Sequence, residues 1–132
     1  MKREIIFTKG AAKPIFNIAH AVRHGDLVFT SGHVARDPAT GILVDGDIKA
    51  QTKRVFLTLT DVLEASNSSL DNVIKATVYL RNIEDRMGFN EIWHEYYPDP
   101  TQCPARTTIK AGDLAPGVGD IEIEVVAHVN HE

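Results

Sequence analysis

The sequence predicts an α+β fold in which two helices pack on one face of a β-sheet. Short runs rich in Ile, Phe and Val, bounded by glycine, occur toward both ends of the chain. Only two segments place apolar residues at helical spacing. Strands that dominate both ends around two helices are typical of an α+β arrangement. The 132 residues suffice for one hydrophobic core, so we expect a single domain over residues 1–132.

The first strands are expected at residues 4–8 and 27–31, which are rich in β-branched and aromatic side chains. Residues 33–36 continue in an extended conformation up to the segment 37–41, where Pro38 presets a turn and Gly41 permits a positive φ. A hairpin is therefore expected at this point.

Two helices follow from spacing and end signals. Asp47 can cap a helix that runs to about Ala65, where a Ser-rich segment ends it. Asn82 or Asp85 can cap a second helix, which Pro98 stops. Its apolar stripe consists of Phe89, Ile92, Trp93 and Tyr96, which we interpret as packing residues rather than as a ligand platform.

The remaining strands are expected at residues 73–80, 105–110 and 121–129, which gives the order β-β-β-α-β-α-β-β. Within 121–129, residues 121, 123 and 125 line one face, while Glu122, Glu124, Val126 and His128 line the other. A second sheet face that mixes apolar and ionisable groups would suit contact between subunits. We therefore expect a homo-oligomer with functional clefts at its rim.

Charge and composition exclude several classes of protein. The net charge of -4 and the pI near 5.8 do not favour nucleic-acid binding. Cys103 is the only cysteine, so no disulfide or zinc knuckle is expected, and a small, partly buried thiol is the preferred interpretation. The sequence shows neither a signal peptide nor a membrane-spanning stretch. These features predict a cytoplasmic protein that binds no membrane.

Common catalytic signatures are missing from the sequence. The six histidines form no HExxH motif, and His128 with His131 is expected to face solvent, so no metal is predicted. Gly117-Val-Gly119 precedes no helix and is a turn rather than a dinucleotide loop. Ser31 and His33 lack a third member for a hydrolase triad. No cofactor is expected.

One pair of residues can carry chemistry. Arg106 and Thr108 share a strand face and can form an anion clamp, because a guanidinium matches a carboxylate with two parallel hydrogen bonds. If the last two strands pair as a hairpin, Arg106 and Glu122 face the same cleft, and Glu122 can move protons or orient water. From spacing alone, an ion pair across the two strands is the more frequent interpretation.

Seven segments, in this order and at these intervals, resemble the Rid family of enamine/imine deaminases (RidA, YjgF type) along almost the whole chain. The segments are 27–32 (LVFTSG), 37–41 (DPATG), 46–52 (GDIKAQT), 69–78 (SLDNVIKATV), 89–90 (FN), 104–106 (PAR) and 121–124 (IEIE). The PAR and IEIE segments correspond to the functional signature of the family.

The resemblance implies a chorismate-mutase-like mixed sheet, assembled as a homotrimer around a central barrel with active sites between subunits. It also implies a hydrolase acting on C=N bonds, without a cofactor. The residue matching Arg106 binds the carboxylate of 2-iminopropionate or 2-aminoacrylate, and that matching Glu122 assists the attack of water. The positions of Thr107, Thr108, Ser31 and Asn90 are expected near the substrate, although Asn90 can equally be a buried amide that ties helix to strand.

The sequence departs from the family pattern at two positions. Ile18 stands where such deaminases usually have a tyrosine, and Thr108 stands where a cysteine is frequent. Phe16 or His20 is then expected to line a pocket of different shape and substrate preference. Two alternatives stay open: a pathway-specific deaminase of a larger unsaturated amino acid, of the aminomuconate type, and a non-catalytic carboxylate-binding trimer with a regulatory or chaperone-like role.

Overall fold

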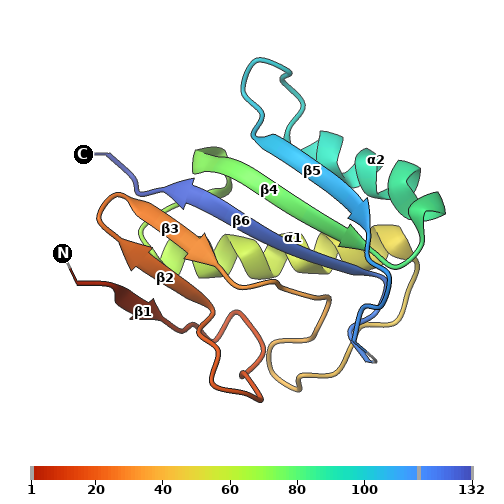
Figure 1. The fold of residues 1–132 in the computed structure, drawn as a ribbon, viewed down its shortest axis with the longest axis horizontal. Coiled ribbons are helices and arrows are strands. Elements are labelled where there is room, and N and C mark those ends of the chain that lie inside the picture. The colour runs from red at the N-terminus through yellow and green to blue at the C-terminus, as the bar shows by residue number, and fades with distance from the viewer. Residues whose placement is uncertain (1, 116, 132) are drawn as a thin grey trace.

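Both helices pack on one face of a six-stranded sheet in the computed structural model, which describes residues 2–115 and 117–131 (Figure 1). The strand order across the sheet is β1-β2-β3-β6-β4-β5. The strands are β1 (Glu4–Ile6), β2 (Ala21–His24), β3 (Leu27–Thr30), β4 (Val73–Leu80), β5 (Ala105–Lys110) and β6 (Ile121–His128). The predicted α+β class, with both helices on one face, is confirmed.

The last two strands do not pair as the hairpin that would bring Arg106 and Glu122 into one cleft. β5 pairs in parallel with β4, and β6 pairs antiparallel with the opposite edge of β4, so β4 separates the last two strands. The cause is the helix between β4 and β5, because a strand-helix-strand crossover returns the chain parallel to its starting strand. β6 then fills the position between β3 and β4, which makes the sheet mixed.

The long helix α1 (Ile48–Ala65) begins and ends where the sequence predicts. The carboxylate of Asp47 accepts a hydrogen bond from the Ala50 N–H at 3.0 Å, which satisfies one of the free donors of the first turn. At its other end Asn67 adopts a positive φ of 57°. The face turned to the sheet buries Val55, Leu59 and Val62 completely.

The second helix, α2 (Arg86–Tyr96), follows one 3-10 turn at Ile83–Asp85. Asp85 occupies the capping position, but its side chain makes no capping hydrogen bond. The predicted packing stripe is buried at Phe89, Ile92 and Trp93, and the Tyr96 ring stacks on Phe56 with centroids 4.3 Å apart. The aromatic stripe therefore joins α2 to α1.

The strand β2 was not among our predictions. Its sequence, Ala-Val-Arg-His, carries little β-branched bulk, and the strand is held by pairing with β1 and β3. The two-residue turn Gly25-Asp26 allows this pairing, with Gly25 at a φ of 61°. Residues 33–36, which we expected as a hairpin strand, make only single bridges, from His33 to Ile123 and from Arg36 to Leu43.

On the face of the sheet opposite the helices, the described residues form no further layer (Figure 1). Alternation along β6 turns Ile121, Ile123 and Val125 into the core and Glu122 and Glu124 to the other face, as predicted. That uncovered face also exposes Ile5, Leu27 and Phe29, each at 40% or more of its surface. No helix among the described residues is long and apolar enough to cross a membrane.

Candidate active site

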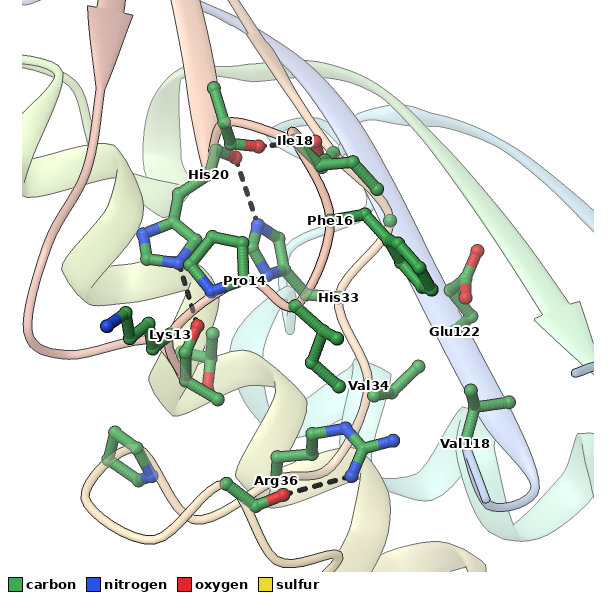
Figure 2. Close-up of a pocket in the computed structure, with 18 of the residues that line it drawn as sticks. Lys13, Pro14, Phe16, Ile18, His20, His33, Val34, Arg36, Val118 and Glu122 are labelled. Carbon is green, nitrogen blue, oxygen red and sulfur yellow. Dashed lines mark hydrogen bonds between the residues drawn. The ribbon is translucent and has the colours of Figure 1, made fainter. Parts of the chain in front are cut away.

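Glu122 lies in a cavity of about 590 Å³ beside the end of β3 (Figure 2). The segments 12–20 and 31–41 form most of the wall, together with Val118 from the loop before β6. Of the site residues that the sequence predicts, Phe16, Ile18, Ser31 and Glu122 all line this cavity. The structure thus brings these four of the predicted site residues together in one cavity.

The carboxyl group of Glu122 is half-buried, and its environment makes ionisation less favourable than for an ordinary carboxyl group. Burial raises the pKa of Glu122, and the nearby charge of Glu124 raises this pKa further. Glu124 is itself engaged, because the Tyr79 hydroxyl donates a 2.5 Å hydrogen bond to its carboxylate. The raised pKa makes the Glu122 carboxylate a stronger base than an ordinary carboxylate, which suits it to take a proton from water.

Gly32 lies directly against the Glu122 side chain. A Cβ atom at position 32 would overlap the Glu122 Oε2 atom and lie 2.8 Å from its Cδ. Side chains are not tolerated at such separations, so the glycine is what allows the carboxylate to occupy this position. Glycine at position 32, the last residue of the segment LVFTSG, is therefore explained by the space that the Glu122 side chain occupies.

His20 anchors the N-terminal wall of the cavity from behind. Its Nδ1 accepts a hydrogen bond from the Thr8 N–H at 3.1 Å, and its Nε2 donates to the Ala12 carbonyl at 2.8 Å. Ser31 fixes the same segment, because its hydroxyl donates to the Ala19 carbonyl at 2.6 Å. Both ring nitrogens of His20 are thus occupied, so His20 shapes the wall and has no free nitrogen for a ligand.

Buried His33 should make the fold sensitive to mild acid. Burial lowers the pKa of His33 below its ordinary value of 6.5, and its Nε2 donates to the His20 carbonyl at 3.0 Å. The unfolded chain binds a proton near pH 6.5 while the folded chain resists it, so stability is full above pH 6.5 and falls as the pH drops from there toward the lowered pKa. Urea unfolding at fixed protein concentration, at pH 7.5 and 5.5, should show this loss.

The matched control for this prediction is exposed His24. In the His24→Gln variant the loss of unfolding free energy between pH 7.5 and 5.5 should equal that of the wild type. In the His33→Gln variant this loss should be smaller. An equal pH dependence in the wild type and His33→Gln would contradict the assignment to His33.

Arg106 occupies a second site, on the other side of the molecule's sheet. Its guanidinium lies over the rings of Phe89 and Trp93, at 5.0 and 4.8 Å from their centroids. Burial lowers the pKa of Arg106, and among residues 2–115 and 117–131 no carboxylate pairs with it. A half-buried cation without a counterion is a site prepared for an anion.

Two buried polar atoms lie on the elements that hold Arg106. Thr108 is two residues further along the same face of β5, and Asn90 follows Phe89 on α2. The Thr108 Oγ1 and the Asn90 Oδ1 are buried without a hydrogen-bond partner among the described residues. Asn90 was expected as an amide that ties helix to strand, but its Oδ1 makes no such hydrogen bond. Both atoms are therefore available to a ligand.

Arg106 and Glu122 do not meet within one chain. Arg106 pairs with Ala76 and shares its helix-covered face, whereas Glu122 pairs with Tyr79 on the uncovered face. The expectation of a shared cleft in one hairpin is therefore wrong, and so is the ion-pair interpretation. Thr107 also lies on the uncovered face, where Lys75 Nζ donates to its hydroxyl at 2.7 Å.

The described cysteine and histidine side chains form no further catalytic or metal site. Cys103 is exposed, which corrects the expectation of a partly buried thiol: it precedes β5 in the loop after Pro98, outside the core. The rings of His128 and His131 stack on each other with centroids 5.1 Å apart. Within the described part of the chain no three His, Cys, Asp or Glu side chains gather as metal ligands.

The family model described as Endoribonuclease L-PSP matches residues 8–129. The chain belongs to this family, the Rid (YjgF) family. A RutC family protein of Pyrococcus abyssi is 40% identical over 128 residues, which cover 97% of this chain and 98% of the relative. A protein of Dermatophagoides farinae named 2-iminobutanoate/2-iminopropanoate deaminase is 31% identical over 124 residues, with 94% of each chain covered.

Solved Rid structures share the fold. The crystal structure of RidA from the Antarctic bacterium Psychrobacter sp. superposes with a TM-score of 0.88 at 32% identity, covering 96% of this chain and 99% of the other. The resemblance drawn from the seven sequence segments is therefore confirmed at the level of family and fold.

Several residues of the candidate site were not predicted from the sequence. Val34, Arg36 and Val118 line the Glu122 cavity, yet each lies in an irregular segment where spacing gives no orientation. Trp93 was interpreted only as a packing residue, although it also supports Arg106. The signal that could have identified Trp93 is the neighbouring Phe89, since two aromatic residues four positions apart on a helix offer one face to a cation.

Proposed function

We propose that this Rid protein is an enamine/imine deaminase that hydrolyses intermediates of the 2-aminoacrylate and 2-iminopropionate type to 2-oxo acids and ammonia. The observation that carries the proposal is the unpaired, half-buried guanidinium of Arg106 on one face and the half-buried Glu122 carboxyl with a raised pKa on the other. The Arg106 side alone lacks a group that accepts a proton, and the Glu122 cavity alone lacks the arginine proposed to bind the α-carboxylate. A homotrimer in which the Arg106 side of one subunit meets the Glu122 cavity of the next would supply both.

The uncovered sheet face supports such an assembly. It exposes Ile5, Leu27 and Phe29 on the same face as the ionisable Glu122 and Glu124, and burial of these apolar groups between subunits would be favourable. The proposed trimer places its sheets around a central barrel, with the helices outside. Substrate then lies between two chains rather than within one.

The proposed reaction follows from the two charged groups. Arg106 binds the α-carboxylate and fixes the position of the neighbouring carbon-nitrogen bond. An enamine gains a proton at its terminal carbon and becomes the iminium, whose electron-poor carbon accepts water. Glu122 takes a proton from that water as the C–O bond forms and passes a proton to the amine nitrogen. The C–N bond then breaks as the hydroxyl oxygen loses its proton and forms the C=O bond, which releases ammonia and the 2-oxo acid.

The direct test is ammonia release from 2-aminoacrylate generated in solution, with and without the purified protein. Acceleration over the spontaneous hydrolysis is the expected result. A parallel series with branched and aromatic imines separates a general deaminase from a pathway-specific enzyme of the aminomuconate type. If no imine is hydrolysed faster than in buffer, the proposed activity is wrong.

Replacing Gly32 by alanine should damage this activity more than it damages the fold. The new Cβ meets the Glu122 carboxyl, so the carboxyl must move out of position. We expect kcat to fall by roughly 10- to 100-fold, with a loss of stability of about 1–3 kcal/mol from overpacking. Gly112→Ala is the control, because nothing lies within 4 Å of a Cβ at that position. Equal activity of the two variants would contradict the placement of Glu122 in the site.

A carboxylate-binding trimer is the second candidate. It is favoured by the composition of the Arg106 site, where the guanidinium and the Thr108 hydroxyl could both donate to an anion without Glu122. Binding of a 2-oxo acid without turnover of any imine would support this function over the deaminase. Nucleic acid is not an expected partner despite the family description, because the net charge is -4.

A further inference from the structure

A second guanidinium belongs to Arg36, a half-buried residue that lines the cavity of Glu122. Its two terminal nitrogens donate to backbone carbonyls, of Gly41 at 2.9 Å and of Gly117 at 2.7 Å. Each terminal nitrogen carries two N–H groups and Nε carries one, so three donors remain after these two bonds. The two carbonyls hold the side chain in place but carry no charge that would neutralise it.

No acidic side chain of the described residues forms an ion pair with Arg36. Its neighbour Asp37 is engaged within its own turn, where its Oδ1 accepts hydrogen bonds from the N–H groups of Ala39 and Thr40 at 2.9 and 3.0 Å. The carboxyl of Glu122 makes no ion pair with it either. The positive charge of Arg36 thus lies at the cavity without a counterion from residues 2–115 or 117–131.

Apolar side chains line the cavity between the two charged groups in the view of Figure 2. In Figure 2 the Arg36 side chain extends toward Val34 and Val118, which lie between it and Glu122 in this view, and Phe16 lies beside Glu122. A ligand that reaches from Glu122 to Arg36 therefore passes along hydrocarbon walls and ends at a cation. Methylene groups followed by an anion match these surroundings.

We propose that Arg36 is a specificity-determining residue, which selects 2-imino and 2-enamino dicarboxylates by binding their distal carboxylate. This inference rests on the proposed function, because the reacting carbon is taken to lie at Glu122 and the α-carboxylate on Arg106. The preferred substrate has an anionic side chain with a short apolar stem. The length of the stem is set by the separation of Glu122 and Arg36 across Val34 and Val118.

The test compares two imines that differ in the charge at the end of the side chain. Imines of glutamate and norvaline are generated in solution by an amino acid oxidase, and the acceleration of 2-oxo acid formation is measured as kcat/KM. The wild type should prefer the glutamate imine by about tenfold or more, as expected for a charge-assisted hydrogen bond in a partly dry site. The aspartate imine, with one methylene fewer, reports the length of the stem.

Two variants separate the charge of Arg36 from its contacts to the loops. Arg36→Met keeps the stem and removes the charge, so the ratio of the two kcat/KM values should fall to near one. Arg36→Lys keeps a charge but not the planar fork that reaches both carbonyls, so the preference should persist at a reduced level. Thermal unfolding of each variant reports the loss of loop contacts independently.

The ratio, rather than either rate, decides the result. A wild type without preference, or an Arg36→Met variant that keeps the preference, would overturn the proposal and leave Arg36 as a loop clamp. If no imine is turned over, the deaminase function fails, and calorimetric binding of 2-oxoglutarate against 2-oxovalerate then decides the question of the subsite. Tighter binding of 2-oxoglutarate that is lost in Arg36→Met supports the subsite, and equal binding of the two acids excludes it.

Discussion

Arg106→Ala should lower kcat/KM for 2-aminoacrylate by about a thousandfold or more, because it removes both the charge and the two-pronged contact that fix the α-carboxylate. The guanidinium is held over Phe89 and Trp93, so its orientation is set before the substrate arrives. Loss of a preorganised contact raises KM and lowers kcat together. The measurement is steady-state hydrolysis of 2-aminoacrylate, combined with calorimetric binding of pyruvate.

Two further variants show whether geometry or charge matters at this position. Arg106→Lys keeps the charge but loses the planar fork, so activity should recover only in part. Lys110→Ala removes an exposed cation from the same strand and should leave the rate near that of the wild type. An equal effect of Lys110→Ala and Arg106→Ala would contradict a specific role for the guanidinium.

The stability of the Arg106→Ala variant gives an independent reading. A residue retained for folding alone would be expected to have a protein partner for its charge, and Arg106 has none among the described residues. Its removal relieves the burial of an unpaired cation while it loses contacts with two rings, so the two effects oppose each other. We expect a change in the free energy of unfolding of about 1 kcal/mol or less.

Glu122→Gln should lower kcat by roughly 100- to 10,000-fold, while the affinity for pyruvate changes only severalfold. The amide has nearly the same shape as the carboxyl but cannot take a proton from water. The pH dependence of kcat/KM should also change. Because burial and Glu124 raise the pKa of Glu122 above its ordinary value near 4.5, the wild type should lose activity on the acid side at a pH above 4.5. This limb should be missing from the residual activity of Glu122→Gln.

Glu124→Gln is the matched control for Glu122. It removes a carboxylate two residues away on the same face of β6, one that accepts a hydrogen bond from Tyr79 rather than facing the cavity. The variant should keep most of kcat and should move the acid limb to lower pH, since the repulsion that raises the pKa of Glu122 is lost. If Glu124→Gln abolishes the rate while Glu122→Gln retains it, the roles of the two carboxylates are exchanged.

The sequence allowed the regular elements to be predicted where each carries its own signal. The Asp47 cap, the apolar spacing of α1 and the alternation of β6 are local properties, and each prediction agreed with the structure. β2 could not be found in this way, because its four residues become a strand through their neighbours and the Gly25 turn. The pairing of β5 with β4 likewise depends on the crossover through α2 rather than on the composition of either strand.

The candidate site was predictable by residue but not by arrangement. Alternation identifies the faces of Arg106 and Glu122, yet the relation between these faces depends on strand order, which spacing does not determine. Arg36 was missed because its orientation comes from two carbonyls in separate loops. Residues in irregular segments acquire their direction from such long-range contacts.

Mixed oligomers of two inactive variants test most directly the claim that each site draws Arg106 from one subunit and Glu122 from another. Arg106→Ala and Glu122→Ala chains are unfolded together in equal amounts, refolded, and compared with each variant refolded alone. Random assembly gives about one quarter of the sites an intact arginine and an intact glutamate, so the mixture should regain roughly a quarter of the wild-type activity. A mixture that is no more active than the separate variants would contradict a site shared between subunits.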